Sequence, residues 1–161
     1  MGSPTPTPGA DAPAGRRAEA AAGGSAPADL VAVESIAVQP DRLVLEVQLA
    51  AHAPRSMDAQ LAERLDRMRP TLKMHACVNG TGPFFGHVMA TTSIPHVLEH
   101  LILDEQVRAE GAPDAFPFSG ITLWLDEGAG RAHIEVSYFD DLTALEAVRT
   151  ATMCLNDLLR G

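Results

Sequence analysis

Ser93-Ile94-Pro95-His96-Val97-Leu98-Glu99-His100-Leu101-Ile102-Leu103 is the stretch that decides the fold, because it combines helix signals with apolar residues on nearly every side. Ser93 is a favoured N-cap type, Pro95 suits the first turn, and Gly111 with Pro113 supplies a stop, so the pattern predicts a helix over about 94–110. A helix that is apolar around most of its circumference belongs in a core. We therefore expect this segment to be the central, buried helix of the domain.

Two histidines and a glutamate interrupt this apolar helix in the pattern H-x-x-E-H: His96, Glu99 and His100. Residues four apart share one side of a helix, so both imidazoles are expected to reach the same metal ion, with Glu99 beside them. The pattern is the inverted zincin signature. The alternative is that both histidines are neutral, hydrogen-bonded core residues and that Glu99 faces a loop. Since an unpaired buried charge is costly, we favour zinc binding.

The chemistry predicted for such a site is hydrolysis of amide or isopeptide bonds. Two neutral imidazoles and a third protein ligand leave one position of a tetrahedral zinc site open for water, whose pKa the metal lowers. Glu99 is the predicted general base, which takes the proton from water and passes it to the leaving amine.

The third ligand stays open at this stage. A segment over 71–92 is rich in glycine, aromatic residues and histidine, and we expect it to line a site. A cysteine in a cytosolic protein is commonly a small buried hydrophobe, and an aspartate at a helix start is commonly an N-cap, so each candidate has a structural alternative. The candidates are Cys77, His75, Glu135, Asp140, Asp141 and Glu146, with His87 as a weaker candidate for substrate contact or a surface loop residue.

The remaining segments predict an α+β fold. Alternating apolar residues predict one hairpin over 30–49 and another over 121–138. Ser56, with Asp58 behind it, is expected to cap a helix that Pro70 closes, and an apolar stripe over 142–159 predicts a last helix. The predicted architecture is an antiparallel sheet of two hairpins with helices packed on one face. We expect a single domain over 28–161.

Residues 1–27 are predicted to be a disordered tail, because this stretch is dominated by Pro, Ala, Gly and Thr and has no continuous apolar run.

Composition and charge argue against several classes of ligand and location. Twelve Lys plus Arg against 21 Asp plus Glu give a net charge of −9, which argues against a nucleic-acid ligand. The two cysteines form no disulfide framework, and no apolar run reaches membrane-spanning length. We expect a cytoplasmic protein that does not enter a membrane.

Four stretches resemble the N-terminal domain of cyanophycin synthetases, in the same order and with similar spacing over most of residues 70–160. They are Pro70-Thr71-Leu72-Lys73-Met74-His75-Ala76-Cys77, Gly82-Pro83-Phe84-Phe85, the helix from His96 to Gln106, and Ile134-Glu135-Val136-Ser137-Tyr138-Phe139-Asp140-Asp141.

The resemblance implies a domain that holds an Asp-Arg polymer and that, in some members of the family, uses the H-x-x-E-H helix to bind zinc and cleave the polymer. By resemblance, His96, Glu99 and His100 carry those roles, and His75 with Cys77 matches a His-x-Cys pair of the family. The family's ATP-grasp and Mur-ligase-like domains have no counterpart in the printed sequence. We therefore expect no amino-acid ligation here.

The implied partners are a peptide or isopeptide polymer and a separate Mur-ligase-like or cyanophycin synthetase protein. Two departures from the family pattern put the substrate in question. Ala90-Thr91-Thr92 replaces a Glu-Gly-Thr stretch, and Phe118-Ser119-Gly120-Ile121-Thr122 lacks basic residues that the family has there. The alternative function is therefore a non-catalytic polymer-binding or accessory module that works with a separate ligase.

Overall fold

The computed structural model describes residues 28–161, so the tail predicted over 1–27 lies outside the described residues. The described chain forms four strands, three α-helices and two short 3-10 turns. In chain order these are β1 (Val31–Val38), β2 (Arg42–Leu49), α1 (Ala59–Met68), η1 (Leu72–Met74), η2 (Phe85–His87), α2 (Ile94–Arg108), β3 (Gly120–Asp126), β4 (Arg131–Ser137) and α3 (Asp141–Arg160).

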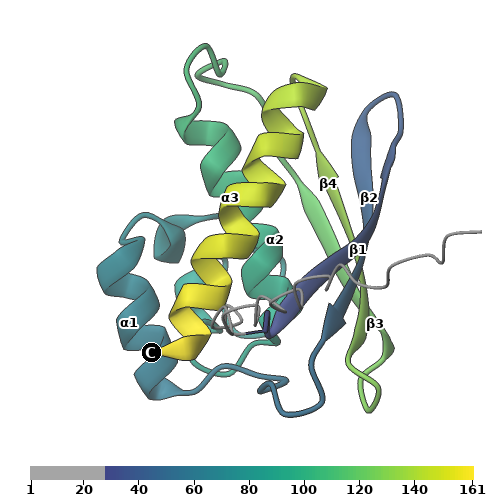
Figure 1. Cartoon of the computed structure of the whole chain (residues 1–161). Helices are drawn as coiled ribbons and strands as arrows, with labels where there is room; N and C mark the ends of the chain where they lie inside the picture. The colour runs from purple at the N-terminus through teal and green to yellow at the C-terminus, as the bar shows by residue number, and fades with distance from the viewer. Residues whose placement is uncertain (1–27) are drawn as a thin grey trace, which may run out of the picture.

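The sheet consists of two hairpins joined side by side. Its strand order is β1-β2-β4-β3, and every neighbouring pair is antiparallel. The central β2–β4 pairing places Leu45 opposite Ile134, so that apolar side chains of both hairpins share one face. The helices lie on that face of the sheet (Figure 1). The α+β architecture predicted from the sequence is thus confirmed.

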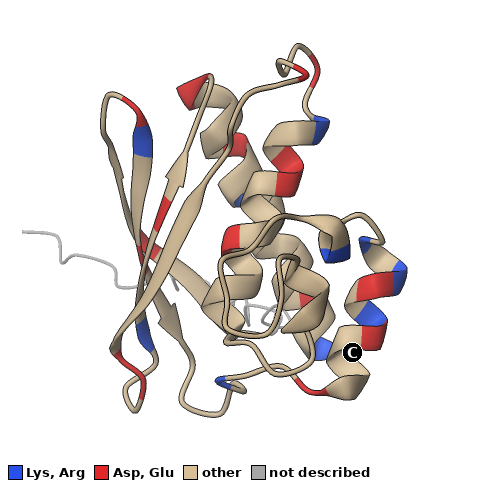
Figure 2. Ribbon diagram, turned by 180° about the vertical axis from the view of Figure 1, so that it is seen from behind, with Lys and Arg blue, Asp and Glu red and all other residues tan. Residues whose placement is uncertain are grey.

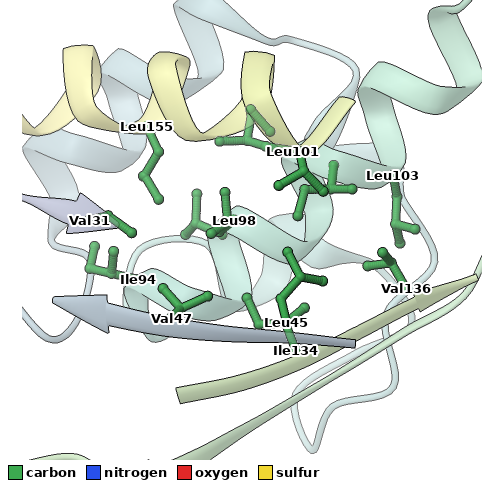
Figure 3. Close-up of a cluster of buried hydrophobic side chains, with 14 of the residues drawn as sticks. Val31, Leu45, Val47, Ile94, Leu98, Leu101, Leu103, Ile134, Val136 and Leu155 are labelled. Atoms are coloured by element: carbon green, nitrogen blue, oxygen red, sulfur yellow. The ribbon is translucent and has the colours of Figure 1, made fainter. Parts of the chain in front are cut away.

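Helix α2 is the central element of the core. Leu98 and Leu101 lie between α3, which contributes Leu155, and the sheet, which contributes Leu45 and other apolar residues (Figure 3). All four of these leucines are fully buried. Because α2 is covered from two sides, its sequence is apolar on most of its circumference instead of on a single stripe.

The ends of the helices follow from local capping. Ser93 caps α2 by accepting a hydrogen bond from the backbone N–H of His96 at 3.4 Å, as the sequence predicts. The helix ends at Arg108, two residues earlier than expected, and Gly111 adopts a positive φ of 82° in the turn that follows.

The predicted cap of α1 was wrong. Asp58, and not Ser56, is the N-cap, since its carboxylate accepts the backbone N–H of Leu61 at 2.8 Å. Ser56 instead forms an isolated β-bridge with Ser93, the cap residue of α2. This bridge ties the start of α1 to the start of the central helix.

Lys and Arg residues of the described region are interspersed with acidic residues along the ribbon (Figure 2). Among residues 28–161, no helix combines the length and the apolar character needed to cross a membrane.

Candidate metal centre

The amino-terminal half of α2 forms the floor of a cleft of about 560 Å3. His96, Glu99 and His100 line it together, as expected for residues one helical turn apart. Two of these side chains are buried, since His100 is only 2% exposed and Glu99 5%, and His96 is partly buried. The opposite walls come from the segment before α2 and from the segment that enters β3: Ala76, Cys77, Val78 and residues Phe118 to Thr122.

Cys77 lies beside the two histidines. Its sulfur is 3.6 Å from Nε2 of His96, and one ligand atom each of Cys77, His96 and His100 lie within 4.8 Å of one another. A thiol and two imidazoles at such separations are the kind of donor set that zinc takes. The candidates for third ligand all lie among the described residues. Of these candidates, Cys77 is the one that forms a possible metal-binding cluster with both histidines.

The segment before α2 holds Cys77 in place through backbone hydrogen bonds. Cys77 N–H donates to the carbonyl of Pro83 at 3.0 Å, and Phe85 N–H donates to the carbonyl of His75 at 2.9 Å. Asn79 closes the turn, because its side-chain oxygen accepts the backbone N–H groups of Thr81 and Gly82. These backbone hydrogen bonds and Asn79 thus fold the irregular segment back on itself against α2.

Phe85 forms an apolar wall behind both imidazoles. It is fully buried, its ring centroid lies 4.1 Å from that of His100, and it meets His96 edge-on at 5.4 Å. Burial lowers the pKa of His96, and burial together with the charges of His96 and His75 lowers the pKa of His100 to about 3. Both rings are therefore neutral near pH 7, which is the form that binds metal.

Each imidazole has a partner for its Nδ1 atom. Nδ1 of His96 lies 2.7 Å from Oγ1 of Thr92, and Nδ1 of His100 lies 3.4 Å from Nδ1 of His75. A neutral imidazole carries one proton, so a ring that donates from Nδ1 keeps a free electron pair on Nε2. These contacts favour Nε2 as the nitrogen that each ring offers to a metal.

Glu99 is buried next to the histidines. Burial raises its pKa to about 7, although the hydrogen bond donated by Thr122 Oγ1 acts in the opposite direction. Gly120 makes room for this carboxylate, because a Cβ atom at position 120 would lie 2.5 Å from Glu99 Oε1. Strand β3 therefore supplies both the hydrogen-bond partner and the space for Glu99.

The acidic candidates for third ligand make other contacts. Glu135 is paired with Arg42 at 2.8 Å and with His133 at 3.1 Å. Asp140 is the N-cap of α3 and accepts the backbone N–H of Thr143, which lowers its pKa. Asp141 is exposed in the first turn of α3, and Glu146 pairs with Arg149 on the surface of the same helix.

His75 and His87 also lie outside the Cys-His-His cluster. His75 stands behind His100, and its Nε2 is 3.4 Å from the carboxylate of Asp104. His87 belongs to η2, where its Nδ1 contacts the backbone of Phe84 and its ring stacks on that phenyl group. His87 is not among the residues that line the cleft.

Sequence reasoning gave no role to three residues that shape this site: Thr92, Gly120 and Thr122. Thr92 stands four residues before His96, a spacing that could have suggested a contact with that ring. Gly120 and Thr122 are more than twenty residues from Glu99 and reach it only through the packing of β3 on α2.

The fold and the site define a small α+β domain whose buried central helix carries two histidines and a glutamate in a cleft. Residues 42–160 match the family model of the cyanophycin synthase-like N-terminal domain, so the chain belongs to that family. The match covers everything from β2 to the end of α3 and therefore includes all the cleft residues. A search of curated proteins gives no match to this chain.

Proposed function

We propose that this protein is a zinc-dependent hydrolase of amide or isopeptide bonds that acts on a cyanophycin-like Asp-Arg polymer. The observation that carries the proposal is the cluster of Cys77, His96 and His100 in a cleft that Glu99 also lines. One thiol and two neutral imidazoles fit zinc better than the hard cations, which prefer oxygen ligands. A zinc ion held there supplies Lewis-acid chemistry, since it polarises an amide carbonyl and makes water more acidic.

Glu99 is the proposed general base. A pKa of about 7 matches the pH at which a carboxylate can both accept a proton and release it to a leaving amine. Thr122 orients the carboxylate through its hydrogen bond, and Gly120 leaves the space that it needs. Phe85 covers one face of the His100 ring and packs edge-on against His96, so it keeps water away from that side of the two imidazoles.

A polymeric substrate is favoured by the position of β3. This strand is at the edge of the described sheet, and Gly120, Ile121 and Thr122 line the cleft. An edge strand offers backbone N–H and C=O groups to an extended chain, which is a common way to hold peptide-like ligands. Membership in the family of cyanophycin synthase-like N-terminal domains supports the Asp-Arg polymer as that chain.

The second candidate is an accessory module that binds the polymer for a separate Mur-ligase-like or cyanophycin synthetase protein. The observation that favours it is the entry to β3, where Ser119, Gly120 and Ile121 line the cleft without a basic side chain. The resemblance places basic residues at this point, so part of the pattern on which the hydrolase proposal draws is missing from the cleft. Binding without turnover is what this candidate requires.

The experiment is a cleavage assay on Asp-Arg polymer and on simple β-aspartyl isopeptides with protein of known zinc content. Glu99→Gln keeps the shape of the side chain but removes the base, so turnover should fall by about 10²- to 10⁴-fold while zinc content stays the same. Glu110→Gln, at an exposed acid beyond the end of α2, is the matched control and should keep full activity.

Equal rates for wild type and Glu99→Gln would remove Glu99 from the reaction. A wild-type protein that binds the polymer but cleaves none of these substrates would favour the accessory module.

A further inference from the structure

A buried acid lies behind the metal centre and is not used by the chemistry proposed above. Asp104 follows His100 by four residues on α2 and is 2% exposed. Its Oδ1 accepts a hydrogen bond from Thr71 Oγ1 at 3.0 Å and lies 3.4 Å from Nε2 of His75. Within the described residues, Oδ2 has no hydrogen-bond partner, although Nη1 of Arg108 approaches to 3.6 Å. Such a carboxylate is costly to bury, so its contacts call for a functional explanation.

The acid is charged in the folded protein. Burial acts to raise the pKa of Asp104, but hydrogen bonds from His75 and Thr71 outweigh it and lower the pKa. A charged carboxylate only accepts hydrogen bonds, so Nε2 of His75 must carry the proton that faces it.

The protons of the two rings can then be placed. In the imidazole tautomer of His75 that has its proton on Nε2, the electron pair lies on Nδ1, which is the atom 3.4 Å from Nδ1 of His100. With that tautomer of His75, His100 donates from its own Nδ1, and its Nε2 keeps a free electron pair. The opposite arrangement would direct an electron pair of His75 at the negative carboxylate, which is repulsive.

We propose that Asp104 and His75 are positioning residues that fix the tautomer and orientation of His100 for metal binding, an inference that rests on the metal site proposed above. His75 is then not itself a ligand. A hydrogen-bond partner on the other ring nitrogen raises the basicity of a metal-binding imidazole, and loss of such a partner typically weakens metal affinity about 10- to 100-fold. Thr92 provides the corresponding contact for Nδ1 of His96.

The test is the affinity for zinc, measured by competition with a chromophoric chelator, of the wild type, His75→Leu, His75→Gln and Asp104→Asn. His75→Leu should bind one zinc per chain with an affinity about 10- to 100-fold weaker. His75→Gln should lose less, because an amide can accept from His100 and donate to Asp104 at the same time. His52→Leu is the matched control, since His52 is exposed and lies outside the cleft, and it should bind as the wild type does.

Cobalt spectroscopy separates a positioning residue from a ligand. If His75 only orients His100, the visible absorption bands of the cobalt-loaded His75→Gln protein should keep the wild-type positions and intensities. Thermal unfolding of the metal-free proteins, with His75→Gln and Asp104→Asn as the mildest changes, shows whether a loss of affinity is merely a loss of fold.

Wild-type affinity in His75→Leu, or a cobalt spectrum in His75→Gln that reports a lost ligand, would overturn this inference while leaving the metal centre intact. Absence of zinc and cobalt binding by the wild type would instead remove the metal centre, and this inference with it.

Discussion

At the scale of single residues, the position of the Glu99 carboxylate depends on the missing side chain of Gly120. A Cβ at position 120 would lie 2.5 Å from Oε1 and 2.6 Å from Cδ and Cγ of Glu99, so the carboxylate has to move. We predict that Gly120→Ala lowers turnover on an amide substrate by one order of magnitude or more, because a general base acts only from the right position. Zinc content, measured in the same samples, should not change.

Gly128→Ala is the control for this prediction. It lies in the turn between β3 and β4, where the nearest atom to an added Cβ is Oδ1 of Asp126 at 3.4 Å. Full activity in Gly120→Ala would mean that Glu99 does not need its present position for catalysis.

The candidate ligand Cys77 is tested by Cys77→Ala. If the sulfur is the third donor, the variant should lose most of its zinc affinity, because two imidazoles alone are a weak site. Cys154, which is half-buried on α3 and belongs to no such cluster, provides the control substitution Cys154→Ala. Zinc affinity that survives in Cys77→Ala would show that the third donor is another group.

At the scale of elements, α2 is the helix on which the core depends. Leu98 is fully buried between α3 and the sheet, whereas Val107 on the same helix is 55% exposed. Leu98→Ala should therefore reduce the free energy of unfolding by about 2–5 kcal/mol, through lost burial and a residual cavity. Val107→Ala should change it by about 0.5 kcal/mol or less. Urea denaturation measures both, and equal effects would contradict the central position of α2.

Helix α3 begins at the N-cap residue Asp140, and we expect the strength of this cap to depend on the charge of the Asp140 carboxylate. The backbone N–H of Thr143 lowers the pKa of Asp140 below its ordinary value of 3.8. The cap should therefore contribute fully above the unfolded-state pKa, and its contribution should be lost as the pH falls through the lower folded-state pKa. We predict that Asp140→Ala lowers the melting temperature at pH 7 and that its difference from the wild type shrinks below about pH 3.8.

The same variant tests whether Asp140 acts only as a helix cap or also as a metal ligand. Asp140 is engaged at the start of α3, so zinc affinity should be the same in Asp140→Ala and in the wild type. A loss of zinc would return Asp140 to the set of possible ligands.

Elements that form through contacts between residues close in the sequence could be predicted, whereas features that depend on long-range contacts could not. Caps and apolar periodicity are local, so α2 and both hairpins could be predicted from neighbouring residues. The start of α1 could not be settled in this way, because Ser56 and Asp58 are both good caps and the bridge between Ser56 and Ser93 is a long-range contact. His96 and His100 could be paired from their helical spacing alone. The position of Cys77 depends on how the segment over 75–87 folds back, for which no periodic signal exists.

At the scale of the whole molecule, metal binding and folding should be coupled. A zinc ion held by Cys77, His96 and His100 would join the segment that carries Cys77 to the core helix α2, and a ligand that binds only the folded state stabilises it by mass action. Free zinc at about 100 times its Kd should add about 2.7 kcal/mol, which corresponds to a rise in melting temperature on the order of 10 °C. Removal of zinc by a chelator should reverse the rise, and an unchanged melting temperature would argue against a bound metal.

The most direct test of the account is the zinc content of the purified protein, compared between the wild type and His100→Ala by elemental analysis after zinc loading and desalting. His100→Ala removes one imidazole from the cluster in the cleft, so we predict about one zinc per chain in the wild type and almost none in the variant. A wild type that holds no zinc after loading, or a His100→Ala variant that keeps the wild-type amount, would contradict the metal centre.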